Sequence, residues 1–203
     1  MEAPVFFDPR GPLDVSRRNL PHWHQDGVMY FVTFRLADSI PRSKLEQWRR
    51  EREEWLRGRP EPSSREDLRE YHGRFPEMIE DWLDAGAGSC LLGQPANARI
   101  VSDALKYFDG QRYRLGAWVV MPNHVHAVFS TIAPHSPTGI LHSWKSYTAV
   151  AINRLCGKTG QLWQHESFDH IVRSESQLRA IERYIEENPA KAGIQAAQSS
   201  SRE

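Results

Sequence analysis

Long apolar runs are absent from this chain of 203 residues, and so is an excess of charge of either sign. Without 18 or more consecutive apolar residues, no membrane-spanning helix is expected. The N-terminal residues lack the basic segment and apolar core of a secretory signal, which favours a cytoplasmic protein. The only two cysteines, Cys90 and Cys156, exclude a disulfide framework and a thiolate metal cluster. The length suits one domain with a core of its own.

The charges balance overall but are unevenly distributed along the chain. Residues 42–84 contain 12 acidic and 10 basic residues, whereas residues 91–173 contain four acidic residues and eight Lys or Arg. A basic half of this kind permits a polyanionic partner without requiring one. No glycine-rich phosphate-binding loop occurs, so nothing indicates the use of ATP.

The order of the expected elements predicts an α+β fold with a ferredoxin-like antiparallel sheet, βαββαβ followed by a C-terminal helix, with helices over one face. Alternating and β-branched residues indicate the strands, and helical periodicity indicates the helices. In chain order these are strand 28–36, helix 96–110, strands 113–121 and 124–132, helix 139–157, strand 162–173 and a final helix from residue 174 that ends before Pro189.

The domain organisation follows from this order. Residues 1–27 are expected to form an N-terminal arm, and residues 28–194 the main domain. Within that domain, the charge-dense residues 42–86 have helical periodicity and predict a helical insertion with solvated polar faces. The tail, residues 195–203, has the composition of a disordered segment.

Two histidines interrupt the apolar stretch VVMPNHVHAVF, residues 119–129. Side chains two apart on a strand share a face, so His124 and His126 can point at one spot while Val125 faces the core. Two neutral imidazoles that converge are half of a divalent-metal site. A pair of edge histidines, solvated or bonded to backbone, is the alternative for this spacing taken alone.

The final helix offers two further groups in RYIEENP. Tyr184 and Asn188 are four residues apart and hence neighbours on one helical face. A hydroxyl beside an amide oxygen suggests a nucleophile next to a third metal ligand. A tyrosine buried against the sheet is the alternative for Tyr184.

Four separated motifs together resemble a known family. RYRLGAWVVMPNHVHAVF, WKSYTAVAINR, LWQHESFDHIVR and RYIEENPAKAGI occur in the order found in single-tyrosine HUH transposases. LPHWHQDGVMYFVTFRLADSIP is similar to the start of the REP-associated tyrosine transposases, a bacterial branch of that family. The resemblance spans roughly residues 17–194 and implies the same ferredoxin-like fold.

The resemblance also implies a chemistry. His124, His126 and Asn188 match the ligands of a Mg²⁺ or Mn²⁺ ion, and Tyr184 matches the catalytic tyrosine. The implied enzyme is a DNA transposase and endonuclease that cleaves and rejoins single-stranded DNA near hairpins through a 5′-phosphotyrosine intermediate. It implies a nucleoid-associated protein of the bacterial cytoplasm that acts as a monomer or homodimer.

Contacts to DNA are expected from basic residues in the matching motifs and from aromatic residues that stack on unpaired bases. Each aromatic side chain could equally belong to the core. The candidates are Arg17, Arg18, Lys145, Arg154, Lys158, Trp163, His170 and Arg173. The tail IQAAQSSSRE departs from the Trp- and Ser-containing end of the family, and residues 42–90 exceed the minimal fold.

Two other functions fit the same residues. A DNA- or RNA-binding regulator could keep the fold without turnover, although the strands lack the aromatic signature of RNP motifs. A metal hydrolase of small phosphoesters could use the same ligands. The combination of His124, His126, Tyr184 and Asn188 favours the transposase.

Overall fold

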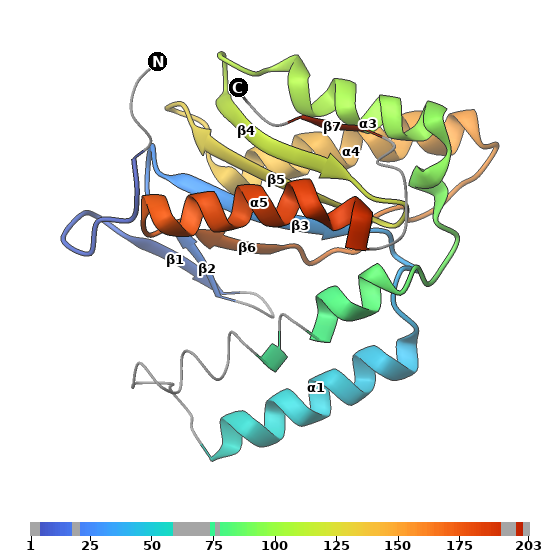
Figure 1. Ribbon diagram of the computed structural model, residues 1–203, viewed down its shortest axis with the longest axis horizontal. Coiled ribbons are helices and arrows are strands. Elements are labelled where there is room, and N and C mark those ends of the chain that lie inside the picture. Colours follow the sequence, from blue (N-terminus) through green and yellow to red (C-terminus); the bar gives the residue numbers. More distant parts are fainter. Residues whose placement is uncertain (1–4, 18–20, 59–73, 76–77, 192–197, 201–203) are drawn as a thin grey trace.

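The computed structural model describes residues 5–17, 21–58, 74–75, 78–191 and 198–200 (Figure 1). The strands are β1 Asp14–Arg17, β2 Pro21–His24, β3 Met29–Arg35, β4 Tyr113–Val120, β5 His124–Thr131, β6 Phe168–Ile171 and β7 Gln198–Ser200. The helices are α1 Arg42–Arg57, the 3₁₀ turn η1 Leu91–Gly93, α3 Pro95–Tyr107, α4 Pro137–Leu155 and α5 Glu175–Lys191. No helix in these ranges is long and apolar enough to cross a membrane.

The main sheet has the strand order β6-β3-β5-β4-β7, and all its neighbours are antiparallel. Without β7, the chain runs β3, α3, β4, β5, α4, β6 and α5. This is the predicted βαββαβ arrangement with one further helix, so the ferredoxin-like fold is confirmed. The strand β5 lies between β3 and β4, which places the histidine pair at the centre of the sheet and not at an edge.

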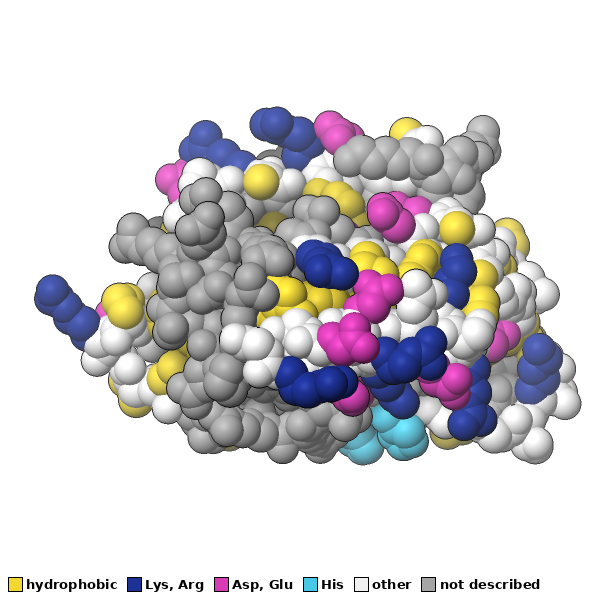
Figure 2. Space-filling model, turned by 90° about the horizontal axis from the view of Figure 1, so that it is seen from below, with side chains coloured by type: hydrophobic (Ala, Val, Ile, Leu, Met, Phe, Trp, Pro, Cys, Tyr) yellow, Lys and Arg dark blue, Asp and Glu magenta, His cyan; other side chains and the backbone are white. Residues whose placement is uncertain are grey.

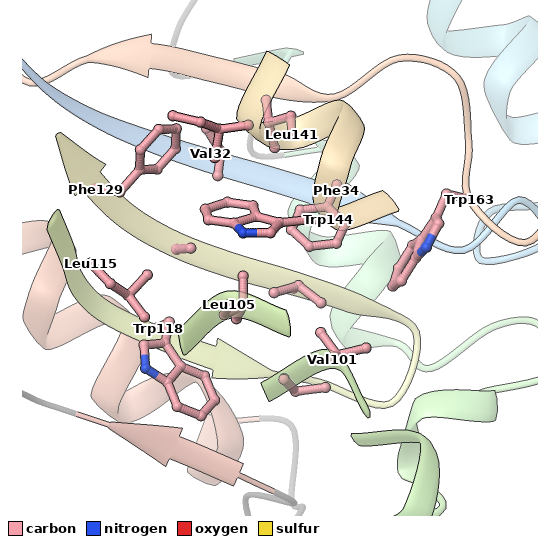
Figure 3. Packing of buried hydrophobic residues seen from close by; sticks show 14 of the residues in the cluster. Val32, Phe34, Val101, Leu105, Leu115, Trp118, Phe129, Leu141, Trp144 and Trp163 are labelled. Atoms are coloured by element: carbon pink, nitrogen blue, oxygen red, sulfur yellow. The ribbon is translucent and has the colours of Figure 1, made fainter. Parts of the chain in front are cut away.

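Helices cover both faces of this sheet, whereas the sequence predicted them on one. The larger core lies between the sheet and α3 and α4, where Trp144 packs among Val32, Phe34 and Phe129 (Figure 3). The strand residues whose side chains point to the other face form a second core. They pack there against Leu178 and Ile185 of α5. Figure 1 shows α5 crossing that face.

The helix α5 continues through Pro189, although the sequence predicted its end before this residue. It begins as predicted, because the Ser174 hydroxyl accepts a hydrogen bond from the Gln177 backbone N–H at 3.2 Å. Pro189 falls in the last turn, where the loss of one helical hydrogen bond is least disruptive. Asn188 is therefore fully helical and lies one turn after Tyr184.

Both ends of the chain contain strands that the sequence did not predict. The N-terminal arm includes the hairpin β1–β2, in which Val15 pairs with Trp23. Within the expected disordered tail, β7 pairs antiparallel with β4, so that Val119 lies opposite Ser199. The composition concealed β7 because its pairing partner is far away in the sequence.

The described part of the insertion between β3 and α3 is mainly helical. The long helix α1 packs on the segment after it, since the Trp48 Nε1–H donates to the Phe75 carbonyl at 3.0 Å. Residues 78–84 form a further short helix, in which Leu83 is buried. Its C-terminal end is joined to the loop after β3, where the Ser89 N–H donates to Asp38 Oδ2 at 2.9 Å.

Candidate active site

The two histidines of β5 converge, as the strand spacing predicted. Their Nε2 atoms lie 3.0 Å apart, and the side chains are 1% and 0% exposed. Val125 points to the opposite face and is buried in the core under α3 and α4. Since both rings are enclosed and lie mid-sheet, the alternative of two solvated edge histidines does not apply.

A polar partner on the outer nitrogen fixes each ring. The His124 Nδ1–H donates to Asn123 Oδ1 at 2.7 Å, because the Asn123 Nδ2 group already donates to two backbone carbonyls. His126 Nδ1 lies 2.8 Å from the Thr33 hydroxyl, which sits opposite it on β3. His126 also stacks on Phe31, with ring centroids 5.5 Å apart. Such outer partners orient metal-binding imidazoles.

Burial keeps both histidines neutral at physiological pH. It lowers the pKa of His124 to about 3, and it lowers the pKa of His126 well below its usual value. With its Nδ1 protonated, neutral His124 directs the Nε2 lone pair at the neighbouring ring. The His126 Nε2–H can then donate to His124 Nε2, and a metal ion bound between the rings would take the place of this proton.

Tyr184 and Asn188 of α5 lie over the histidine pair. The Tyr184 hydroxyl is 3.4 Å from His126 Nε2, and the two rings meet edge to face with centroids 5.2 Å apart. Asn188 is 0% exposed, and its Oδ1 and Nδ2 make no well-formed hydrogen bond within the described residues, although its side chain interacts with the Tyr184 hydroxyl. A buried amide whose hydrogen bonds are incomplete is costly.

The phenol of Tyr184 is held in its neutral form. Burial raises its pKa most, and the charges of Glu80 and Asp84 and a hydrogen bond with Glu80 raise it further. The Asn188 amide acts in the opposite direction. A neutral phenol is a weak nucleophile, so this arrangement requires a group that takes its proton during reaction.

The residues present fit a divalent ion of the Mg²⁺ or Mn²⁺ type. Adjacent ligands about 2.1 Å from an octahedral ion lie roughly 3 Å apart, which matches the 3.0 Å between the two Nε2 atoms. The amide oxygen of Asn188, one helical turn after Tyr184, would supply a third donor, and within the described residues no cysteine belongs to a metal-binding group that would favour zinc. The described residues contain no group of three or more His, Cys, Asp or Glu that could hold a metal.

Only part of the predicted DNA-binding set lies near this site. His170 of β6 is on the same face and packs against Phe31, with centroids 5.4 Å apart. Arg173 is exposed in the short segment between β6 and α5. Arg154 and Lys158 are exposed at the end of α4, on the opposite face of the sheet. The side chain of Arg17 and the whole of Arg18 fall outside the described residues.

Two of the predicted DNA contacts have structural partners instead. Trp163 is 4% exposed, packs on Phe34 at 4.9 Å between centroids, and donates from Nε1 to the Thr148 hydroxyl at 2.9 Å. The prediction of base stacking by Trp163 is therefore wrong, because its face belongs to the core. Lys145 Nζ donates to the carbonyls of Gln164 and His165 at 2.7 and 2.9 Å, and so fastens the loop before β6.

The structure adds four residues to the site that the sequence did not reveal: Asn123, Thr33, Glu80 and Asp84. Asn123 adjoins the histidine motif, and its proximity was the one available signal. Thr33 becomes apparent only from the register of β3 with β5. Glu80 and Asp84 are four apart on one helical face, a pattern hidden by the many other charges of the insertion.

Charges of both signs are mixed on the face of the molecule shown in Figure 2. In Figure 2, which views the molecule from below Figure 1, Lys and Arg side chains of the described residues lie among Asp and Glu side chains. The residues drawn in colour on this face do not form a continuous basic patch. Any contact with a polyanion on this side therefore depends on individual basic residues.

Comparison with known proteins shows similarity to transposases. Residues 94–188 match the family described as transposase IS200 like. The structure of a REP-associated tyrosine transposase bound to a REP hairpin is similar, with a TM-score of 0.52 and 18% identity. The similarity covers 87% of this chain and 75% of that one. No curated protein matches the chain.

A second solved structure is more distant. It is a transposase candidate from Deinococcus radiodurans R1, with a TM-score of 0.36 and 15% identity over 85% of this chain and 96% of that one. The matched family segment includes both histidines, Tyr184 and Asn188, and the fold agrees with that of the REP-associated enzyme. Residues 94–188 of this chain are therefore similar to the IS200-like transposases, as the sequence motifs predicted.

Proposed function

We propose that this protein is a metal-dependent transposase that cleaves and rejoins single-stranded DNA through a covalent bond to Tyr184. One observation carries the proposal: the Tyr184 hydroxyl lies 3.4 Å from His126 Nε2, beside two converging imidazoles and the buried amide of Asn188. A nucleophile, a metal-binding donor set and a helical support thus meet at one point on the sheet.

Each side chain has a distinct task in this reaction. His124, His126 and Asn188 would hold Mg²⁺ or Mn²⁺, which polarises a phosphoryl oxygen when bound. Tyr184 attacks the phosphorus, and the 3′ oxygen of the DNA leaves, so that a 5′-phosphotyrosine bond replaces the phosphodiester. Because the phosphoester bond energy is retained, a DNA hydroxyl can later displace Tyr184 without ATP.

A DNA hairpin with a flanking single strand is the proposed substrate. The support is the similarity to a REP-associated transposase whose structure contains a REP hairpin. Within this chain, His170 lies on the same face as the site, and the exposed Arg173 follows β6. Arg154 and Lys158, at the far end of α4, remain candidates for contacts with phosphates away from the scissile bond.

Covalent trapping tests the proposal directly. Labelled single-stranded DNA with REP-like hairpins is incubated with the protein and Mn²⁺, and the products are separated under denaturing conditions. We expect a protein–DNA adduct from the wild type and none from Tyr184→Phe. The matched control is Tyr147→Phe, since Tyr147 is an exposed tyrosine of α4 on the opposite face and should retain the adduct.

Histidine variants separate binding from chemistry. His124→Ala combined with His126→Ala should abolish cleavage while hairpin binding, measured by fluorescence anisotropy, persists. If the wild type binds hairpins but forms no adduct with any divalent ion, the protein is a non-catalytic binding regulator and the proposal fails. Adduct formation by Tyr184→Phe would exclude Tyr184 as the nucleophile.

A further inference from the structure

The helical insertion reaches the active site through residues 78–84. The Asn123 side chain, which orients His124, donates from Nδ2 to the Leu83 carbonyl at 3.0 Å and to the Ala87 carbonyl at 3.2 Å. Figure 1 shows this helical segment, in green, next to the C-terminal end of α5. Leu83 is 1% exposed, so the segment is packed in place and not only tethered.

Two carboxylates of this segment face the nucleophile. Glu80 forms a side-chain hydrogen bond with Tyr184, and Asp84 lies close enough for its charge to act on the same phenol. Glu80 and Asp84 are four residues apart and therefore share one face of the helix. The groups around the Tyr184 hydroxyl are thus Glu80 and Asp84 from the insertion, His126 from β5 and Asn188 from α5.

We infer that Glu80 is the proton acceptor for Tyr184, so that the insertion supplies a catalytic residue to the transposase reaction. This inference rests on the proposed function, because it assigns a base to the proposed nucleophile. It also gives the insertion a role, although the segment lies outside the family match at residues 94–188.

The proton balance of the step is simple. As the bond from Tyr184 Oη to phosphorus forms, the phenolic proton passes to the Glu80 carboxylate. The bond from phosphorus to the 3′ oxygen breaks, and that oxygen takes a proton from water. In rejoining, the proton on Glu80 returns to the departing Tyr184 oxygen, as microscopic reversibility demands.

Neighbouring residues argue against other tasks for Glu80. His124 and His126 do not form a metal-binding group with any described carboxylate, so Glu80 is not placed as a ligand of the histidine site. His126 is a poor base for Tyr184, because its Nε2 atom faces His124 Nε2 at 3.0 Å and is one of the proposed metal ligands. The half-buried Glu80 can exchange protons with solvent between turnovers.

A single-turnover experiment on full-length protein tests the inference. The rate of adduct formation is measured with hairpin DNA and Mn²⁺ from pH 6 to pH 9 for the wild type and Glu80→Gln. Loss of a general base costs roughly 100-fold or more, so we expect such a fall for Glu80→Gln at pH 7. The deficit should shrink as pH rises, because hydroxide then removes the proton.

The matched control is Asp81→Asn, which removes one negative charge from the exposed side of the same segment. It should cleave at the wild-type rate, and hairpin affinity should not weaken in either variant. A wild-type rate and pH profile in Glu80→Gln would overturn the assignment of Glu80 while leaving the proposed function intact. So would a faster Glu80→Gln, which would identify the carboxylate as inhibitory. Failure of the wild type to form any adduct would overturn both.

Discussion

Thr33 and Asn123 determine how the two imidazoles of the site are oriented. Each bonds the Nδ1 atom of one ring and leaves both Nε2 atoms facing each other at 3.0 Å. An imidazole without such a partner can rotate about its side-chain bonds. A hydrogen bond to Nδ1 instead holds the ring in the orientation that a metal ion would require. In the proposed enzyme, the outer partners would therefore contribute to metal affinity without touching the metal.

Thr33→Val tests this contribution. Valine keeps the shape of threonine but lacks the hydroxyl that lies 2.8 Å from His126 Nδ1. Loss of such a partner typically weakens metal binding by about 10- to 100-fold. We therefore expect half-maximal cleavage to need that much more Mn²⁺, with near-wild-type activity at saturation.

Thr131→Val is the control for this prediction. Thr131 is also buried, but its hydroxyl accepts from the Gly27 N–H at the other end of β5. Its Mn²⁺ dependence should match that of the wild type. An unchanged Mn²⁺ dependence in Thr33→Val would show that the hydroxyl does not support the ligand.

For individual residues, the sequence predicted those whose partners are close in the sequence and missed those whose partners are far away in the sequence. The face shared by His124 and His126 follows from strand geometry alone. Contact of Glu80 with Tyr184 depends on how the insertion docks, and no local pattern encodes that. Trp163 failed as a prediction because an aromatic residue in a motif has the same appearance whether it stacks on a base or fills a core.

Among the secondary-structure elements, α5 shows packing overriding a local preference. The residue before a proline avoids helical backbone, which predicted the end of the helix at Asn188. Burial of Ile185 and Asn188 against the sheet keeps this turn helical through Pro189. The site gains from this, since only a helical Asn188 stands directly beside Tyr184.

The pairing of the edge strand β7 with β4 can be tested by hydrogen exchange. It covers the otherwise open side of β4, where Trp118, Val119 and Val120 pair with residues 198–200. Truncation after residue 194 should expose that edge, so the backbone amides of residues 118–120 that face β7 should exchange hydrogen faster. Mass spectrometry of deuterium uptake measures this. Residues 125–129 of the central strand β5 should be unaffected, and equal uptake at 118–120 in both proteins would contradict the pairing.

In the molecule as a whole, Tyr30 joins the N-terminal arm to the sheet. Its hydroxyl donates to the Gln25 carbonyl at 2.7 Å and accepts from the Gln25 N–H at 2.8 Å. The Gln25 side chain in turn bonds both the N–H and the carbonyl of Asp8. Burial, above all, raises the pKa of Tyr30 to about 12.

This pKa predicts a loss of stability at alkaline pH. Between pH 10 and pH 12 the unfolded chain has lost the phenolic proton that the folded chain retains, so the free energy of unfolding falls as pH rises. The difference between the usual tyrosine pKa of about 10 and the Tyr30 pKa of about 12 corresponds to a loss of about 2–3 kcal/mol in the free energy of unfolding. Chemical denaturation at pH 9 to 12 should show a smaller fall for Tyr30→Phe than for the wild type. Parallel curves would mean that Tyr30 ionises equally in both states.

The overall architecture was easier to predict from the sequence than the site residues or the ends of single elements. Periodicity and element order are enough to indicate a ferredoxin-like sheet, since each strand and helix pattern is local. The placement of α5 on the opposite face from α3 and α4 was not predicted, because the choice of face depends on which side of the sheet still exposes apolar residues. That side holds Phe31, Val119 and Val128, next to the histidines.

The amide of Asn123 has a consequence for how this molecule can work. One end of it grips an imidazole, and the other end grips two carbonyls of the insertion. A shift of the segment 78–84 would therefore strain the hydrogen bonds that orient the ring of His124. In the proposed enzyme, a nucleic-acid strand that displaced this segment would disturb a metal ligand and move Glu80 away from Tyr184 at the same time.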